Sequence, residues 1–75
     1  MMNVCNGELF IAQCNTYHDE IGWIESGDLV MIIDAHADKN YALIMTRSCV
    51  ANASKSWLTA KIKMKDFVFR WVENE

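Results

Sequence analysis

Asp34, His36 and Asp38 are the residues whose types and spacing most favour metal binding in this 75-residue chain. Because side chains alternate along a strand, all three point to the same side if the strand predicted over residues 28–36 continues this far. Asp and His are ordinary metal ligands. Their spacing matches no specific zinc or calcium motif, so we expect a solvated strand end without a metal or other cofactor. One cluster elsewhere contains residue types that could complete such a set: His18, Asp19 and Glu20.

Trp57, Lys61, Lys63 and, on the next predicted strand, Arg70 could form a binding surface for single-stranded nucleic acid. In the strand predicted over residues 56–64, the first three share one face. Such a face suits a nucleic acid because bases stack on aromatic rings and lysines contact phosphates. The same lysines would equally protect a solvated edge, and the net charge of −3 argues against a general affinity for nucleic acid. Nucleic-acid binding is therefore the alternative function.

Nucleophilic catalysis by cysteine and histidine is a third candidate, since the chain holds three Cys and two His. No family signature surrounds any of them. The sequence also contains no Gly-rich phosphate loop, no Gly-x-Ser-x-Gly elbow and no His-Glu-x-x-His pair. A chain of this length has little room for an enclosed pocket. We therefore expect a protein that is not an enzyme and has no catalytic residue.

Length and composition predict one small domain over residues 1–75. Hydrophobic residues make up 52% of the chain, which argues against disorder. A domain this small usually needs a disulfide, a metal or oligomerisation for stability. No apolar run approaches the roughly 18 residues that cross a bilayer. Residues 1–14 lack the basic start of a secretory signal, and the odd number of cysteines fits free thiols, so we expect a cytoplasmic protein outside the membrane.

Apolar patterning predicts an all-β chain. The ranges that favour strands are residues 8–14, 28–36, 41–47, 56–64 and 67–73, with a short irregular strand over 21–24. The polar stretches over residues 15–20 and 48–55 are predicted to be loops. Residues 37–40 favour a hairpin turn, because the Asp and Asn in this stretch tolerate left-handed conformations.

The hairpin predicted over residues 28–47 is apolar on both faces. One face carries Val30, Ile32, Ala42 and Ile44. The second face carries Leu29, Met31, Ile33, Leu43 and Met45. Since a small barrel has one interior, the second face must be covered from outside. We expect residues 9–12 and Trp23 to cover part of it and a second copy of the chain to cover the rest.

Five aromatic residues form a further candidate set: Trp23, Trp57, Phe67, Phe69 and Trp71. The last three alternate along the last predicted strand, so they share one of its faces. We expect this face to belong to the core. The alternative is an exposed aromatic stripe, which would favour a protein interface.

The run Ile24-Glu25-Ser26-Gly27-Asp28-Leu29-Val30 resembles the opening of many small Src-homology-3-like barrels, including short ones encoded by bacteriophages and other mobile elements. In those proteins Gly-Asp-x-Val starts the first barrel strand. An apolar return strand, a strand opening with Trp and a short last strand ending in an acidic residue follow, here over residues 41–46, 57–60 and 69–73. The usual Gly of the second strand is replaced here by residues 42–44, Ala-Leu-Ile. The resemblance implies a five-stranded barrel with a binding or accessory role, to which the preceding segment adds a strand or cap.

These patterns together predict a non-enzymatic interaction module that self-associates through the second face of the hairpin, with an unidentified protein as a further partner. Another small Greek-key barrel or a short sandwich is the alternative fold. Salt dependence distinguishes the two functions. Binding to phosphates weakens steeply as salt rises, whereas burial of apolar surface is insensitive to screening.

Overall fold

The computed structural model describes residues 4–70, which form a mostly β structure with one short helix. The elements in chain order are β1 (Leu9–Ala12), β2 (Thr16–His18), β3 (Gly22–Ile24), β4 (Leu29–Asp34), β5 (Tyr41–Met45), β6 (Val50–Ser54), α1 (Lys55–Lys63) and β7 (Phe67–Phe69). The all-β class predicted from the sequence is confirmed in this coarse sense.

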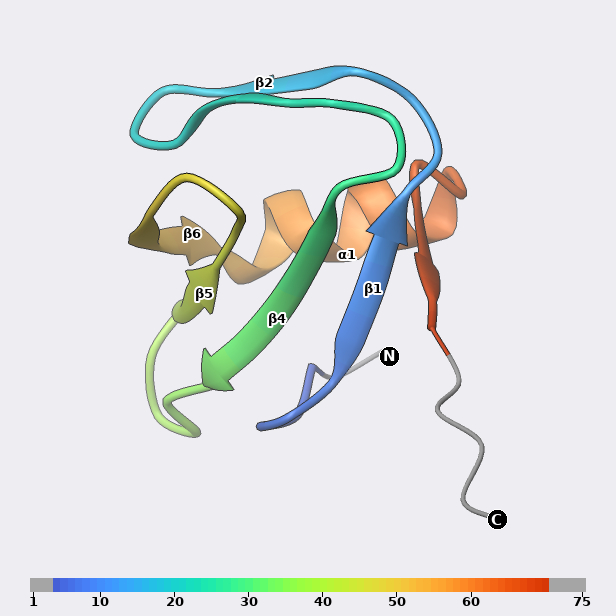
Figure 1. The fold of residues 1–75 in the computed structure, drawn as a ribbon. Coiled ribbons are helices and arrows are strands. Elements are labelled where there is room, and N and C mark those ends of the chain that lie inside the picture. Colours follow the sequence, from blue (N-terminus) through green and yellow to red (C-terminus); the bar gives the residue numbers. More distant parts are fainter. Residues whose placement is uncertain (1–3, 71–75) are drawn as a thin grey trace, which may run out of the picture.

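The strands form two antiparallel sheets (Figure 1). The larger sheet has the order β6-β5-β4-β1-β7, and the smaller one is the β2–β3 hairpin, inserted between β1 and β4. The edge strands β6 and β7 are not paired with each other among the described residues, so the larger sheet is open. Its middle strand is β4, which pairs on one side with β5 and on the other with β1, a strand from a separate part of the chain.

The core lies between the larger sheet, α1 and the β2–β3 hairpin. In Figure 1, α1 lies behind β1 and β4, and the hairpin lies across their upper ends. Alternate strand residues point inward because side chains alternate along a strand. The largest fully buried side chains are Phe10, Ile24, Val30, Ile32, Ile44, Leu58 and Phe67. The face of the hairpin that carries Val30, Ile32, Ala42 and Ile44 is therefore its core face.

Three of the predicted elements are wrong. Residues 56–64 were expected to form a strand, but most of them belong to α1, and residues 48–55 were expected to form a loop, but they contain β6. The stretch 15–20, also predicted to be a loop, contains β2. The last strand was expected over residues 67–73. Its described part, β7, ends at Phe69, and Trp71 and Glu73 lie outside the described residues.

Helix α1 is defined by its two ends. The Ser54 hydroxyl accepts a hydrogen bond from the Trp57 N–H at 3.3 Å, which satisfies one of the free donors of the first turn. At the other end, Lys65 has a positive φ of 65°, and the Asp66 N–H donates to the Lys61 carbonyl. This pattern, with a left-handed residue closing the helix, is a Schellman motif. The Leu58 side chain, four residues before Ile62, anchors the helix in the core.

Within residues 4–70, the single helix is too short to cross a membrane. The three cysteines carry free thiols. Cys5 and Cys14 are exposed, and Cys49 is partly buried.

Candidate interaction surface

The side of the larger sheet that faces away from α1 carries at least one apolar side chain on each of the five strands. We call this side the outer face. Its apolar residues alternate with the core positions: Leu9, Ile11, Leu29, Met31, Ile33, Leu43, Met45, Val50 and Val68. Tyr41, Asn52 and Ser54 lie on the same side of β5 and β6. The five residues predicted from the hairpin all belong to it. Strands β4 and β5 pair antiparallel and place these residues on one side of the sheet, with a register shift after Ile32 that sets Leu43 opposite Asp34 rather than Ile33.

Strand pairing places the outer-face side chains in rows. Leu9 lies opposite Met31, Met31 lies opposite Met45, and Met45 lies opposite Val50, so one row crosses four strands. Side chains that lie directly opposite each other on one face are in contact range. The row therefore forms a continuous apolar band.

A second row begins on the other edge of the sheet. Ile11 lies opposite both Leu29 on β4 and Val68 on β7. Sequence reasoning missed the contributions of β1, β6 and β7 to this surface. The alternation of Leu9 and Ile11 with the buried Phe10 and Ala12 was the available signal, since a central strand that is apolar throughout has two apolar faces.

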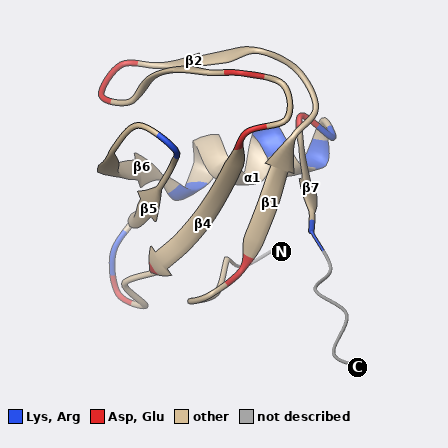
Figure 2. Ribbon diagram, in the orientation of Figure 1, with Lys and Arg blue, Asp and Glu red and all other residues tan. Residues whose placement is uncertain are grey.

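The outer face is incompletely covered by the described residues. Leu29 and Met45 each retain 41% of their accessible surface, Ile33 retains 39% and Val50 retains 51%. Figure 2 shows the charged residues at the ends of β1 and β4, in loops and on α1, but not along the middle of these two strands. A contiguous exposed apolar patch with charges only at its border is typical of an interaction site.

One end of the outer face is hollowed. A depression of about 470 Å³ is lined by Leu9, Gly27, Asp28, Leu29, Met31, Met45, Thr46 and Arg47. Its floor is apolar and its rim is polar. An apolar side chain of a partner could enter it and lose contact with water, which is how the central residues of protein interfaces act.

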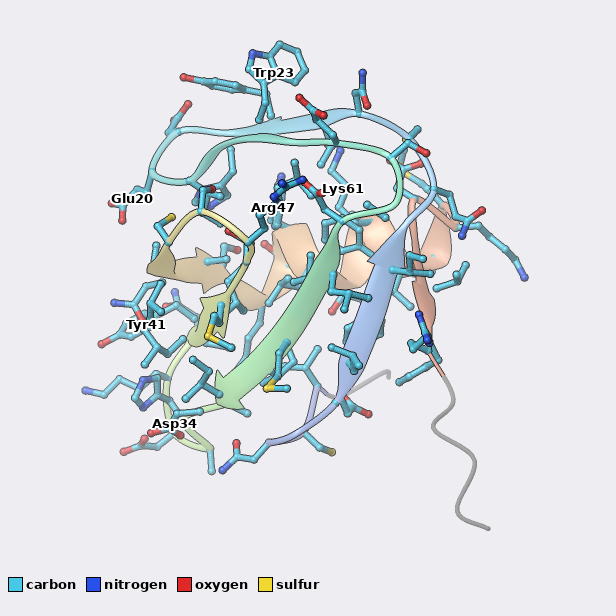
Figure 3. All side chains as sticks on the ribbon, in the orientation of Figure 1. Glu20, Trp23, Asp34, Tyr41, Arg47 and Lys61 are labelled. Carbon is cyan, nitrogen blue, oxygen red and sulfur yellow. The ribbon has the colours of Figure 1, made fainter. Side chains whose placement is uncertain are left out.

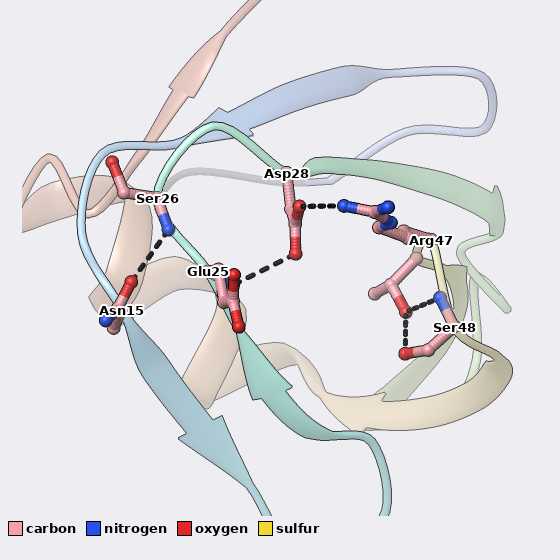
Figure 4. Close-up of polar contacts among 7 residues, drawn as sticks. Asn15, Glu25, Ser26, Asp28, Arg47 and Ser48 are labelled. Carbon is pink, nitrogen blue, oxygen red and sulfur yellow. Dashed lines mark hydrogen bonds and ion pairs between the residues drawn. The ribbon is translucent and has the colours of Figure 1, made fainter.

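Asp28 organises the polar rim of this depression (Figure 4). One carboxylate oxygen accepts a hydrogen bond from the Glu25 N–H at 3.0 Å, and the other lies 3.8 Å from the Arg47 guanidinium. Gly27, the residue before Asp28, has a φ of +96°, a conformation that other residues rarely adopt. Arg47 is largely exposed, so its ion pair with Asp28 contributes about 1 kcal/mol or less. The Gly-Asp turn thus leads directly into β4 at the rim of the depression.

The expected covering of this face by residues 9–12 and Trp23 is wrong. Strand β1 lies beside β4 and extends the outer face. Trp23 lies on the β2–β3 hairpin and points away from the molecule (Figure 3). It is 64% exposed and packs edge-to-face on Tyr17 at 5.4 Å between ring centroids. Among the described residues, the sheet is therefore covered on its core side alone.

The residues of the alternative nucleic-acid surface do not share a strand face. Trp57 and Lys61 lie one helical turn apart, with the ammonium 5.7 Å from the ring centroid. Lys63 is two residues further on, a rotation of about 200° around the helix axis from Lys61. Arg70 follows β7. The helix therefore removes the strand geometry on which this surface was predicted.

Trp57 is also engaged in the structure. Its ring packs edge-to-face on His18 at 4.7 Å and on Phe67 at 5.7 Å. The neighbouring Lys61 ammonium lies 3.5 Å from the Asp66 carboxylate. A ring held between two others offers less surface for stacking on a base. In the aromatic set, Phe67 is buried as expected, whereas Phe69 is 44% exposed and packs on Phe10.

The candidate metal residues form a pair. The His36 imidazole lies 3.5 Å from the Asp34 carboxylate, which also accepts a hydrogen bond from the His36 N–H. Asp38 lies in the exposed turn beyond them. His18 belongs to the β2–β3 hairpin, where its ring accepts a hydrogen bond from the Glu20 N–H. Across residues 4–70, no three His, Cys, Asp or Glu side chains gather in a way that could hold a metal ion.

Cys14 lies beside Asp66, next to the C-terminal end of α1. A hydrogen bond with the Asp66 carboxylate raises the pKa of the Cys14 thiol above its ordinary value. The negative charge of Asp66 acts in the same direction, and the nearby Lys61 ammonium opposes it. A raised pKa leaves less thiolate at neutral pH, so this site does not favour a nucleophilic cysteine.

Comparisons with models of protein families, with curated proteins and with solved structures find no match to this chain.

Proposed function

We propose that the chain is a non-enzymatic protein-interaction module that associates with itself through the outer face. The observation that carries this proposal is the partly exposed apolar row across four strands, from Leu9 through Met31 and Met45 to Val50. Fully burying one Leu, Ile or Met side chain stabilises by roughly 1.5–3 kcal/mol. A second copy that covers the row would bury part of several such side chains at once.

A second copy of the chain is a suitable partner for the outer face, because the middle of this face carries no net charge. Two copies of a chain with net charge −3 repel each other wherever acidic residues meet. The apolar rows keep the acidic residues at the border of the contact. A two-fold contact of this kind uses the same patch on both copies, as most homodimers do.

For the fold, we propose the Src-homology-3-like arrangement that the Gly27-Asp28-x-Val30 motif suggests. Three features support it: the motif leads into β4, the β2–β3 hairpin is inserted between β1 and β4, and α1 separates β6 from β7. We also propose a cytoplasmic location, because free cysteine thiols suit a reducing compartment.

The test is to place a charge on the outer face. We expect Leu29→Lys and Met31→Lys each to weaken association at least tenfold while the chain stays folded, because a buried lysine must lose its hydration. Sedimentation equilibrium gives the association constant, and circular dichroism reports folding. Tyr17→Lys is the matched control, since it adds the same charge to an exposed position on the β2–β3 hairpin.

Two results would count against the proposal. If both outer-face variants unfold, these residues are needed for the core. If the unmodified chain stays monomeric at millimolar concentration, the outer face does not mediate self-association.

A further inference from the structure

Strand β6 forms one edge of the larger sheet. Two backbone hydrogen bonds, one at each end of its pairing with β5, determine which of its residues bond to β5. The Thr46 N–H donates to the Cys49 carbonyl at 2.8 Å, and the Lys55 N–H donates to the Asn40 carbonyl at 2.8 Å. Bonded pairs recur at every second residue of an antiparallel ladder. In this register, the backbones of Ala51 and Ala53 bond to β5. Those of the three other β6 residues do not.

Val50, Asn52 and Ser54 therefore point their backbone N–H groups away from the sheet. Val50 and Asn52 also point their carbonyls outward, whereas the Ser54 carbonyl serves the first turn of α1. The nearest structure beside this edge is the tip of the β2–β3 hairpin (Figure 1). A hollow of about 410 Å³ lies between that tip and Asn52 and Ser54, and no described residue accepts a hydrogen bond from the outward N–H groups of β6.

The β6 edge also lacks the features that keep sheet edges from pairing. Natural edge strands are commonly protected by lysine, proline, a bulge or an inward charge. The β6 sequence is Val-Ala-Asn-Ala-Ser, which has no charge and no proline, and its register with β5 is regular throughout. Open backbone groups on an unprotected edge are a template for a further strand.

We propose that β6 pairs with β6 of a second copy, antiparallel, about a two-fold axis at Asn52. In this register the two Asn52 residues exchange a pair of backbone bonds. The Ser54 N–H of each copy donates to the Val50 carbonyl of the other. The spacing of the outward groups is symmetric about Asn52, so the strand is complementary to itself in this register.

A second copy suits this edge better than a charged partner. The strand carries no charge, so two identical strands meet without repulsion and an oppositely charged segment gains nothing from it. On the outer side of the sheet, Val50 would meet Ser54 and Asn52 would meet Asn52, whose amides can donate and accept at once. Pairing would also join two outer faces into one larger sheet surface.

This contact is separate from the outer face, since it uses backbone groups in the plane of the sheet. One chain could engage in both contacts, one through the face and one through the edge. The two are therefore tested by different readouts, and either can fail alone.

The decisive measurement is amide hydrogen exchange, resolved by residue, at low and high protein concentration. We expect the Asn52 and Ser54 amides to exchange at least tenfold more slowly at high concentration. Ala51 and Ala53 are internal controls, because their amides bond to β5 in every state. If the chain associates while the exchange of Asn52 and Ser54 stays independent of concentration, the edge proposal is overturned and the outer-face proposal stands.

Two variants of Asn52 test the backbone directly. Asn52→Pro removes an outward N–H that no described residue uses, a place where proline is tolerated in an edge strand. We expect it to abolish edge pairing. Asn52→Ala keeps the N–H and should retain most of the pairing. Association of Asn52→Pro equal to that of Asn52→Ala would overturn the proposal. Should Asn52→Pro fail to fold, the exchange measurement on the unmodified chain decides.

Discussion

Met31 and Met45 lie directly opposite each other across β4 and β5, on the side of the sheet that α1 does not cover. Each follows a core residue by one position along its strand, since Val30 and Ile44 are fully buried. Neighbouring residues in these strands therefore point to opposite sides of the sheet and have different roles. One set holds the fold together, and the other is available for association.

Truncating adjacent residues should show which of the two roles each side chain has. We expect Ile44→Ala to lower the free energy of unfolding by about 2–5 kcal/mol, because it leaves a cavity in the core. Met45→Ala should cost about 1 kcal/mol or less, because that side chain is partly solvated in the folded monomer. Urea denaturation at a concentration where the chain is monomeric measures both. Equal losses would mean that Met45 is needed for folding as much as Ile44.

Self-association should depend little on salt. The outer face has its charges at the border, and burial of apolar surface is not screened by ions. We expect the association constant to change less than about threefold between 50 mM and 500 mM sodium chloride, which is far less than phosphate contacts would show. Sedimentation at the two salt concentrations provides the measurement. A loss of tenfold or more on raising salt would indicate an electrostatic contact instead.

Replacing Lys65 by glycine should stabilise the chain. Lys65 has a φ of 65° in the turn that closes α1, and a left-handed residue other than glycine costs roughly 1–2 kcal/mol. We expect Lys65→Gly to raise the free energy of unfolding by about 1 kcal/mol. Lys63→Gly is the control, since it lies inside α1 and should lower stability by about 1 kcal/mol. Thermal or urea unfolding measures both variants. A free energy of unfolding that falls in Lys65→Gly would contradict the prediction.

The Cys14 thiol should react slowly with alkylating reagents near neutral pH. Its hydrogen bond with Asp66 raises its pKa, so the reactive thiolate forms only at higher pH. We expect Asp66→Asn to move the midpoint of the pH–rate profile to lower pH and to speed alkylation at pH 7.5. Cys5 is far from Asp66 in the sequence, so its alkylation rate serves as the internal reference. An unchanged profile for Cys14 would show that Asp66 does not control it.

The central hairpin could be predicted from the sequence because its signals are local. Val30 and Ile32 alternate with Leu29, Met31 and Ile33, and the turn between the two strands is polar. Both the core face and the outer face follow from that pattern. The chain supplies no such local signal for which strand lies on the other side of β4, and so the place of β1 between β4 and β7 was not predicted.

Helix α1 was misjudged because its sequence fits two periods. Leu58, Ala60 and Ile62 alternate with polar residues as a strand would, but Leu58 and Ile62 also lie one helical turn apart. The structure adds the Ser54 cap, a local hydrogen bond that favours the helix and that alternation does not reveal. Strand β6 was missed for a different reason. Its small residues have weak strand propensity, and its pairing with β5 supplies the structure.

The order of the strands also has a consequence for the time course of folding. Strands β4, β5 and β6 are consecutive neighbours and can pair through short turns, whereas β1 must find β7 across nearly the whole described chain. Closing such a long loop is entropically costly and slow. Phe10 and Phe67 enter the core from those two distant strands. We therefore expect the cooperative step to come last, so that a fragment ending before Phe67 remains unfolded and the complete chain folds as one unit.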